Sequence, residues 1–544
     1  MSAAVGPPTR NANSENFPVA SLLLSRALRP KILGFYRFVR TADDIADAPG
    51  LDAAEKLARL AALERALDDP ATAEPAARPL HDSDCGTQEA RRMLAAFRQD
   101  AVQRRYADWA ELEAYCAASA DPVGRMLLRL HGETSDDAVR AADALCTALQ
   151  VLNHLQDLVP DREKLDRVYV PEPWMALAGG EEAFFGADAT RRRAVLEAAL
   201  DRVEERLDAA AALPRLVRDR RLAMESRVTI ALARQLLAKL RAGDPVAGRV
   251  ALGKVDFAWA FAGAALPGPG DAAIVARRVA RAGSSFARGM AALRGDRRRA
   301  LWAVYAFCRA VDDIADGAMP AAEKRRFLAD WRAKLARPDC ALSRELARAR
   351  EGYGLPVEEC EAMIAGMETD AAPRLRIADR ATLDLYCRRV AGSVGAMAVR
   401  IFGAPEAAAF GLGLGRTLQL VNILRDMDED ALRDRVYLPL DLLAAHGVAD
   451  GEARWMMAAP GVAAAAAVLA AEAEAGFARA EAELRAFDNP ALLPARIMMW
   501  GYRRLFDRLV ARGFGGPRLR PRLTLGEKAR MAAYALRLAP VAAR

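Results

Sequence analysis

The sequence predicts an all-α protein built as two tandem helical bundles, and three observations support this. First, 544 residues exceed what one hydrophobic core usually serves, which favours two domains of roughly 270 residues. Second, apolar residues recur at three- and four-residue spacing with charged residues opposite them, whereas alternating strand patterns are scarce. Third, several segments occur twice in the same order. The composition agrees, since 53% hydrophobic and 28% charged residues suit amphipathic helices.

The helical spacing is clearest in residues 53–67, 192–213 and 321–336, which we expect to form amphipathic helices. Breaks rich in proline and glycine occur at 68–79, 241–248 and 266–271. The last of these, "LPGPGD", is the best linker because its prolines and glycines cannot continue a helix. We therefore predict one domain over residues 1–267 and a second over 268–544.

The repeated segments lie at a nearly constant offset. "FYRFVRTADDIAD" at 35–47 matches "VYAFCRAVDDIAD" at 304–316 at an offset of 269, and "YCAASADPVG" at 115–124 matches "YCRRVAGSVG" at 386–395 at an offset of 271. An asparagine and two aspartates spaced four apart, at 153–161, recur at 422–430. Ordered matches of this kind indicate a tandem duplication of one domain.

Charge and cysteine content limit the classes of partner and compartment. The net charge is +7, but basic and acidic residues alternate without a long basic tract, so we expect no nucleic-acid partner. An anionic substrate or an anionic membrane surface is compatible with the excess. The seven cysteines include no CxxC, which is typical of reduced thiols, and residues 1–17 lack the apolar core of a signal peptide. We expect a cytoplasmic protein, with peripheral contact at the inner face of the membrane left open.

The duplicated carboxylates indicate a metal-diphosphate site. Residues four apart share one face of a helix, so Asp43 with Asp47, and Asp312 with Asp316, each present two carboxylates one turn apart. Two acidic faces across a bundle would repel each other unless a cation lay between them. Carboxylate and amide oxygens are ligands that Mg²⁺ accepts while keeping positions for water and phosphate. The pattern therefore predicts Mg²⁺ and a diphosphate between two acidic helices in each half.

A simpler interpretation is that each acidic motif is a solvated helix face. Arg40 with Asp44, and Arg309 with Asp313, would then be ordinary ion pairs four residues apart. The context favours a site, because the aspartates follow aromatic stretches that belong in a core. Acidic side chains beside a core cost free energy unless a partner compensates their charge. The presence of both motifs in both halves strengthens this interpretation.

Four segments of the C-terminal half resemble the signatures of the squalene and phytoene synthase family. They are "SSF" at 284–286, "YAFCRAVDDIAD" at 305–316, "YCRRVAGSVG" at 386–395 and "NILRDMDEDALRDRVYLP" at 422–439. The resemblance implies an isoprenoid-synthase-type helical bundle in each half, joining isoprenyl diphosphates head to head. The C-terminal half, with "GMETD" at 366–370, is similar to members that make presqualene diphosphate from two farnesyl diphosphates in hopanoid pathways. The N-terminal half, with "ENFPVAS" at 15–21 and "NHLQD" at 153–157, is similar to members that convert presqualene diphosphate and water to hydroxysqualene.

The resemblance also implies roles for individual residues. Those implied to hold Mg²⁺ and its diphosphates are Asp312, Asp313, Asp316, Asn422, Asp426 and Asp430, with the counterparts Asp43, Asp44, Asp47, Asn153, Asp157 and Asp161. Those implied to be catalytic are Arg309, Arg425 and Arg40, which would neutralise phosphate, and Tyr386 with its counterpart Tyr115, where Tyr386 would assist proton removal during cyclopropane closure. Those implied to bind substrate are Ser284, Ser285, Phe286, Arg435, Tyr437, Arg167 and Tyr169. Without the resemblance, Tyr386 reads as a core tyrosine and "RVYLP" as a helix-ending turn.

The N-terminal half departs from the family pattern. Gln156 stands where Arg425 does, and Pro160 stands where Glu429 does. Proline disfavours helical geometry at the preceding residue and deletes a backbone donor, so we expect the helix to kink or stop before Asp161, the least secure ligand. "ENF" at 15–17 also replaces "SSF". These changes fit a half that handles one diphosphate, and a degenerate structural half is the alternative.

Other functions stay open at this point. The enzyme alternative is a phytoene or dehydrosqualene synthase with one catalytic half and one scaffold half. No GxGxxG follows a strand, since "GLGLG" at 411–415 sits in a helical context, and the four histidines lack zinc-like spacing. The basic amphipathic segment 526–544 either rests on a membrane or packs on its own domain. A downstream squalene-forming oxidoreductase is a further candidate partner.

Overall fold

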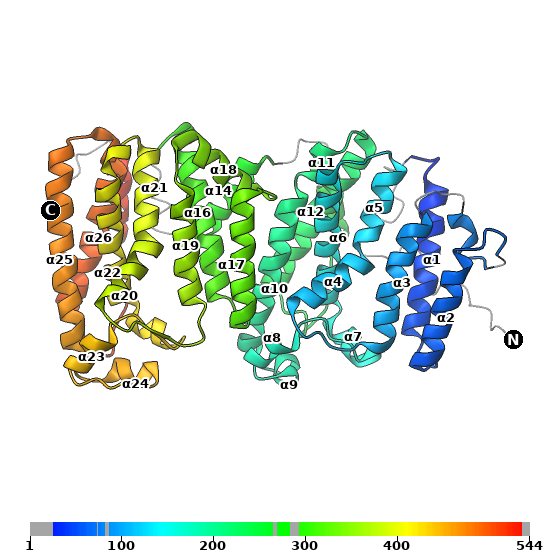
Figure 1. Ribbon diagram of the computed structural model, residues 1–544, viewed down its shortest axis with the longest axis horizontal. Coiled ribbons are helices and arrows are strands. Elements are labelled where there is room, and N and C mark those ends of the chain that lie inside the picture. The colour runs from blue at the N-terminus through cyan, green and yellow to red at the C-terminus, as the bar shows by residue number, and fades with distance from the viewer. Residues whose placement is uncertain (1–24, 73, 82–85, 265–268, 283–292, 536–544) are drawn as a thin grey trace. The chain divides into compact units, whose positions relative to one another are not determined.

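The computed structural model describes residues 25–72, 74–81, 86–264, 269–282 and 293–535, and its architecture is helical (Figure 1). The chain divides into two compact units, one up to Pro269 together with Gly317–Pro320, and one from Gly270 onward. The two strands in the described residues are two residues long each. The prediction of an all-α protein is therefore confirmed. The predicted boundary between residues 267 and 268 lies within residues 265–268, which are outside those described.

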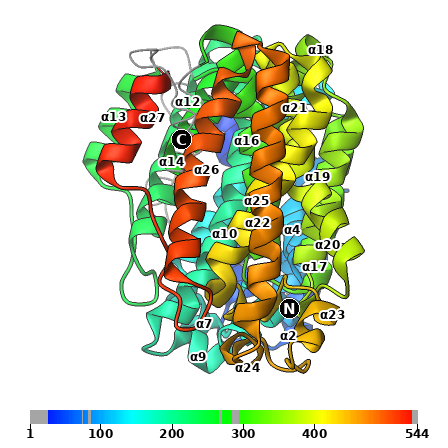
Figure 2. The same cartoon turned by 90° about the vertical axis from the view of Figure 1, so that its left-hand side faces the viewer.

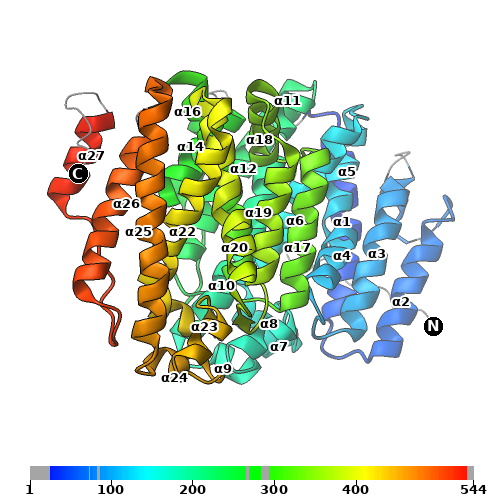
Figure 3. The same cartoon turned by 60° about the vertical axis from the view of Figure 1, so that its left-hand side comes forward.

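The first unit is a bundle of helices joined by short turns. Its helices are α1 (Arg29–Asp47), α2 (Ala53–Ala66), η2 (Arg78–Leu80), α3 (Gly86–Val102), α4 (Trp109–Ser119), α5 (Asp121–Leu130), α6 (Asp136–Gln156), α7 (Leu158–Leu165), α8 (Glu172–Leu177), α9 (Glu181–Phe185), α10 (Ala189–Ala210), α11 (Leu213–Leu216), α12 (Arg220–Ala242) and α13 (Lys254–Ala264). Helices α1, α2 and α3 lie side by side (Figure 3), and α6 packs against α5 and α10. The site of this unit is built on α1, α3, α4 and α6.

Apolar burial fixes the rotation of α1. Phe35, Phe38 and Ile45 lie on its buried face, where they pack with Leu60 of α2 and Leu94 of α3. Burying side chains of this size contributes about 1.5–3 kcal/mol each. Because the buried face is fixed, the acidic residues at the end of α1 are held at the edge of the core in a set orientation.

The second unit repeats this plan. Its elements are α14 (Asp271–Ala282), α16 (Gly295–Asp316), α17 (Ala321–Ala336), α18 (Ala341–Tyr353), α19 (Val357–Asp370), β1 (Leu375–Arg376), α20 (Arg380–Cys387), the π-helical turn η4 (Arg388–Gly392), α21 (Ser393–Phe402), η5 (Pro405–Ala407), α22 (Ala408–Ala431), β2 (Arg435–Val436), α23 (Leu440–Ala445), α24 (Ala453–Ala458), α25 (Val462–Phe487), η6 (Pro490–Leu492), α26 (Leu493–Arg512) and α27 (Leu525–Ala535). Helix α22 lies beside α25 and α26 (Figure 2).

Glycines in "GLGLG" allow α22 to approach its neighbours closely. A Cβ on Gly411 would lie 2.5 Å from the carbonyl oxygen of Gly395, and one on Gly415 would lie 2.3 Å from that of Ala391. The motif therefore serves helix packing. The helix is also long and apolar enough, by length and composition, to cross a membrane over Pro405–Ala431, with 50% of that apolar window buried within the protein.

The two units differ where Pro160 occurs. In the first unit, α6 ends at Gln156 and a new helix, α7, begins at Leu158, so Pro160 lies in the first turn of α7. In the second unit, α22 continues unbroken to Ala431. The expected break before Asp161 is confirmed, and its cause is the position of proline, which is tolerated in a first turn but not inside a helix.

Candidate active site

An arginine clamps the first acidic motif of each unit. In the first unit, Arg40 contacts Asp43 (Nη1 to Oδ2, 2.7 Å) and Asp44 (Nη2 to Oδ1, 2.9 Å). Burial, reinforced by the charge of Asp47, raises the pKa of Asp43 to about 7. This carboxyl therefore sits in an environment that disfavours its charge.

The second unit reproduces this geometry on α16. Arg309 contacts Asp312 (Nη1 to Oδ2, 2.8 Å) and Asp313 (Nη2 to Oδ1, 2.7 Å). Burial and the neighbouring Asp316 raise the pKa of Asp312 to about 7. The arginines predicted to neutralise phosphate are thus paired with carboxylates in the absence of substrate.

A second arginine joins three elements in the first unit. The guanidinium of Arg167 donates to Asp47 (Nη1 to Oδ1, 2.6 Å), to the carbonyl of Ala46 (3.2 Å) and to the carbonyl of Asp100 (2.9 Å). The residue is 4% exposed. A buried fork of this kind fixes α1 to the end of α3 and to the segment after α7.

Arg435 makes the same three bonds in the second unit. It donates to Asp316 (Nη1 to Oδ1, 2.6 Å), to the carbonyl of Ala315 (3.0 Å) and to the carbonyl of Asp370 (2.8 Å). Arg433 adds a further ion pair to Asp316 at 2.7 Å. Burial opposes ionisation, but the two arginines hold the pKa of Asp316 below its usual value.

The predicted tyrosines converge on a buried aspartate that sequence reasoning missed. Tyr386 Oη donates to Asp370 Oδ2 at 3.0 Å, and Tyr437 Oη donates to its other oxygen at 2.7 Å. In the first unit, Tyr115 Oη donates to Asp100 Oδ2 at 2.9 Å. Burial raises the pKa of Asp370, and that of Asp100, to about 6. Burial also raises the pKa of Tyr386 well above its usual value, so it is held as a neutral donor.

One residue distinguishes the tyrosine cluster of the first unit. The ring of His154 stacks on Tyr169 with centroids 3.4 Å apart, and Ile423 occupies the matching position in the second unit. Burial, with the nearby charge of Arg167, lowers the pKa of His154 to about 3, so the imidazole is neutral.

The second acidic motif of the second unit projects from α22. Asn422 Oδ1 is buried and lacks a hydrogen-bond partner within the described ranges, while its Nδ2 donates to Gln419 at 3.2 Å. Arg425 holds Asp426 through two bonds of 2.8 and 2.6 Å, and Arg520 contacts the same carboxylate at 2.9 Å. Burial and the charge of Asp426 raise the pKa of Asp430 to about 7.

The corresponding acidic motif of the first unit has less positive charge beside it. Asp157 has an ion pair with Arg249 at 3.8 Å. Gln156, which replaces Arg425, donates to the carbonyl of Val250 at 2.6 Å. Burial, then the charges of Asp157 and Asp47, raise the pKa of Asp161 to about 7, so both acidic faces act on this carboxyl.

The carboxylate and amide oxygens of the two acidic motifs are chemically suited to a hard divalent cation. Among the residues that the structure describes, no three histidine, cysteine, aspartate or glutamate side chains already converge to hold a metal ion. Two observations nevertheless favour a cation: the amide oxygen of Asn422 has no described partner, and Asp312 and Asp430 are each half-buried beside another carboxylate. Carboxylate and amide oxygens are the ligands Mg²⁺ takes in small numbers.

Three predicted site residues, Ser284, Ser285 and Phe286, lie outside the described residues, as does the "ENF" segment at 15–17. Of the other predicted residues, Arg40, Asp43, Tyr115 and Asn153 line one cavity in the first unit. In the second unit, hydrogen bonds join Arg435 to Asp316 and join Tyr386 and Tyr437 to Asp370. Sequence reasoning missed Asp100, Asp370, Arg433 and Arg520. Asp100 and Asp370 are 270 residues apart, close to the offsets of the other repeats, and this spacing could have identified these two aspartates.

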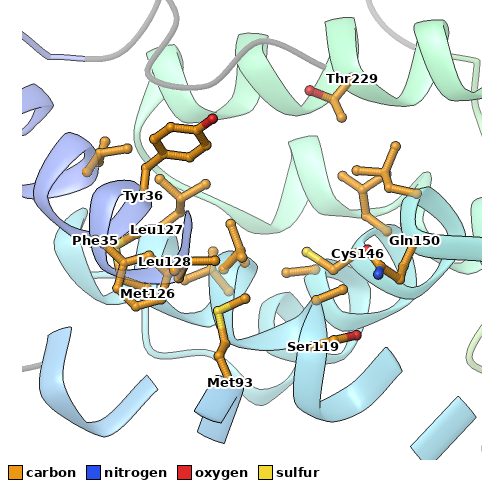
Figure 4. A pocket seen from close by; sticks show the side chains of 18 of the residues that line it. Phe35, Tyr36, Met93, Ser119, Met126, Leu127, Leu128, Cys146, Gln150 and Thr229 are labelled. Atoms are coloured by element: carbon orange, nitrogen blue, oxygen red, sulfur yellow. The ribbon is translucent and has the colours of Figure 1, made fainter. Parts of the chain in front are cut away.

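The site of the first unit opens into a cavity of about 430 Å³. Arg40, Asp43 and Asn153 line its polar part, and the rest is mainly apolar. Figure 4 shows Phe35, Met126 and Leu128 on one side, with Cys146 and Gln150 on the other. A charged mouth continuous with an apolar cavity suits a molecule with an anionic head and a hydrocarbon tail.

Comparison with known proteins identifies the family. The family model described as squalene/phytoene synthase matches residues 10–256 and again 279–527. Presqualene diphosphate synthase of Rhodopseudomonas palustris is 42% identical over 245 residues, which cover 43% of this chain and 87% of that protein. Hydroxysqualene synthase of the same organism is 39% identical over 256 residues, covering 46% and 87% respectively.

A solved structure of a squalene synthase from Alicyclobacillus acidocaldarius is 32% identical, with a TM-score of 0.38, and covers 42% of this chain and 89% of that chain. The family model accounts for most of the chain in two successive matches. The chain therefore belongs to the squalene/phytoene synthase family, with one family domain in each half, and it is an enzyme of the prenyltransferase type.

Proposed function

We propose that the C-terminal unit condenses two farnesyl diphosphates to presqualene diphosphate, and that the N-terminal unit converts this product and water to hydroxysqualene. The observation that carries the proposal is the unequal positive charge at two otherwise matching sites. Arg425 and Arg433 contact the acidic motifs of the second unit, whereas Gln156 replaces Arg425 and turns toward Val250 in the first. A site for two diphosphates needs more positive charge than a site for one.

Both units would use Mg²⁺. In the second unit the ligands would come from Asp312, Asp316, Asn422, Asp426 and Asp430, and in the first from their counterparts on α1, α6 and α7. When bound, the metal ion would neutralise the diphosphate and so favour its departure.

In the second unit, the arginines beside the acidic motifs would stabilise negative charge as a diphosphate leaves. Arg309 and Arg425 each present a guanidinium next to a predicted ligand, and diphosphate oxygens can replace the carboxylate partners they have now. The departure leaves an allylic cation, which the double bond of the second farnesyl diphosphate attacks. Tyr386 would then assist the proton loss that closes the cyclopropane, with Asp370 orienting its hydroxyl.

In the first unit, Arg40 would assist the departure of the diphosphate of presqualene diphosphate. The apolar cavity behind it would hold the hydrocarbon chains while the cation rearranges. Water then attacks the cation and gives an alcohol. This step consumes no reductant.

The second candidate is a phytoene or dehydrosqualene synthase in which the first unit is a scaffold. The break between α6 and α7 and the loss of Arg425's counterpart favour it. The preserved clamp of Arg167, Asp47 and Asp100 weighs against a purely structural unit, because a buried ion pair is a weak source of stability.

Product analysis tests the assignment. The purified chain is given farnesyl diphosphate and Mg²⁺ without a nicotinamide cofactor, beside Asp43→Ala and Asp312→Ala variants. We expect hydroxysqualene from the unaltered chain, presqualene diphosphate from Asp43→Ala and no condensation product from Asp312→Ala. An unchanged product from Asp43→Ala would support the scaffold alternative.

A further inference from the structure

A hydroxyl with no hydrogen-bond partner in the described part of the chain lies in the wall of the first unit's cavity. Ser119, the last residue of α4, is 8% exposed and lines the cavity, and its Oγ has no hydrogen-bond partner among the residues that the structure describes. It lies one helical turn beyond Tyr115, on the same face of α4. Figure 4 shows it among the side chains that line the cavity. A buried hydroxyl with no partner costs free energy unless a water or ligand completes its bonding.

The second unit has no hydroxyl at this position. In the repeat that aligns Tyr115 with Tyr386, Ser119 corresponds to Val390. A Cβ on Gly366 would lie 2.4 Å from the Val390 side chain, so Gly366 provides the space that valine needs. The first unit has Ala96 where the second has Gly366. Small and large residues thus differ together between the units, and a serine in the first stands where a valine stands in the second.

Two other polar residues of the same wall, Gln150 and Ser226, do not combine these features. Gln150 lines the cavity, but it recurs as Gln419 in the second unit. Ser226 also lines the cavity, but its Oγ donates to the carbonyl of Leu222 at 2.8 Å. Ser119 therefore combines burial, a place in the cavity wall, an unsatisfied hydroxyl and a difference between the units.

We propose that Ser119 Oγ binds the water molecule that captures the carbocation in the N-terminal unit. This inference rests on the proposed function of that unit and adds to it the residue that decides between alcohol and hydrocarbon products. Val390, at the matching position of the second unit, has no hydroxyl to offer such a bond, which suits a reaction that ends by losing a proton and admits no water.

The proposed step balances as follows. A lone pair of the water oxygen forms the C–O bond to the cationic carbon, and one O–H bond of that water breaks. The proton passes to an oxygen of the diphosphate already released, so no oxidant or reductant is needed. Ser119 accepts a hydrogen bond from the water, which aims its free lone pair at the cation.

The test follows the fate of presqualene diphosphate in the full-length protein. Presqualene diphosphate, Mg²⁺ and ¹⁸O-labelled water are supplied, and labelled alcohol and hydrocarbon products are measured against diphosphate released. The variants are Ser119→Ala, Ser119→Thr and the pair Ser119→Val with Ala96→Gly, which copies the packing of the second unit. A melting curve for each variant checks that it is folded.

We expect the ratio of alcohol to hydrocarbon to fall about tenfold in Ser119→Ala, the effect of losing one hydrogen bond worth about 1.4 kcal/mol. The valine pair should lower it further because it also removes the space for water, and Ser119→Thr should keep alcohol as the main product. An unaltered ratio in both the alanine variant and the valine pair would overturn the inference. If the unaltered chain itself forms no alcohol from presqualene diphosphate, the proposed function fails as well.

Discussion

The two units share one scaffold of buried charges and differ in what surrounds it. Arg167 and Arg435 make the same three hydrogen bonds, and Tyr115 and Tyr386 donate to matching aspartates. The second acidic motif differs, because α22 is continuous and bears Arg425, whereas α6 ends before Asp157 and bears Gln156. After duplication, the residues that orient the site were kept, while those that set its charge and its access to water changed.

The largest expected effect comes from removing the shared clamp. Arg435→Ala leaves Asp316 and two backbone carbonyls without their donor, and should lower the free energy of unfolding of the second unit by about 3–5 kcal/mol. Arg167→Ala should do the same to the first unit. Denaturant unfolding measures both losses. If the loss in either unit is below about 1 kcal/mol, the value of an exposed ion pair, the clamp does not stabilise both units alike.

Exchanging the residues at the helix break tests the difference in backbone. Glu429→Pro places proline inside α22 and should cost about 3 kcal/mol. Pro160→Glu should cost less than about 1 kcal/mol, because Pro160 occupies a first turn where its missing N–H is not needed. Glu429→Ala is the control for loss of the ion pair with Arg520. Equal costs for both exchanges would contradict the distinction between α6–α7 and α22.

Arg425→Gln imports the first unit's residue into the second and tests the difference in charge. We expect the consumption of farnesyl diphosphate to fall about 100-fold, because a donor to the leaving diphosphate is lost. The conversion of presqualene diphosphate should be unchanged, since that reaction is assigned to the other unit. Initial rates with each substrate separate the two effects. Equal slowing of both reactions would argue against the division of labour.

The pH dependence should be alike in the two units. Asp43 and Asp161 in the first, and Asp312 and Asp430 in the second, have pKa values raised to about 7 from 3.8. Between these values the folded protein holds more protons than the unfolded chain, so without Mg²⁺ the free energy of unfolding falls as pH rises toward 7. Mg²⁺ binding releases these protons, so the rise in melting temperature that it causes should be larger at pH 8 than at pH 6. Melting curves at both pH values, with and without MgCl₂, measure this, and equal shifts would speak against binding by these carboxyls.

The fold and much of the site follow from the sequence. Helical spacing and duplication predicted an all-α chain with two tandem domains, and Pro160 predicted the break before Asp161. The pairing of Arg40 with Asp44 follows from spacing within one helix. Arg520 contacts Asp426 across 94 residues, and Asp370 meets Tyr437 across 67. Contacts of this range depend on how helices pack, which local patterns do not reveal. Ser119 reads as an ordinary serine until its burial and missing partner are known.

If the two units catalyse consecutive reactions, supplying the intermediate alone separates their activities. Presqualene diphosphate and Mg²⁺ are given to the Asp312→Ala and Asp43→Ala variants, and hydroxysqualene is measured. We expect Asp312→Ala to form hydroxysqualene at the rate of the unaltered chain and Asp43→Ala to form none. If Asp43→Ala forms hydroxysqualene and Asp312→Ala does not, the division between the units is wrong, since the second unit would then catalyse both steps.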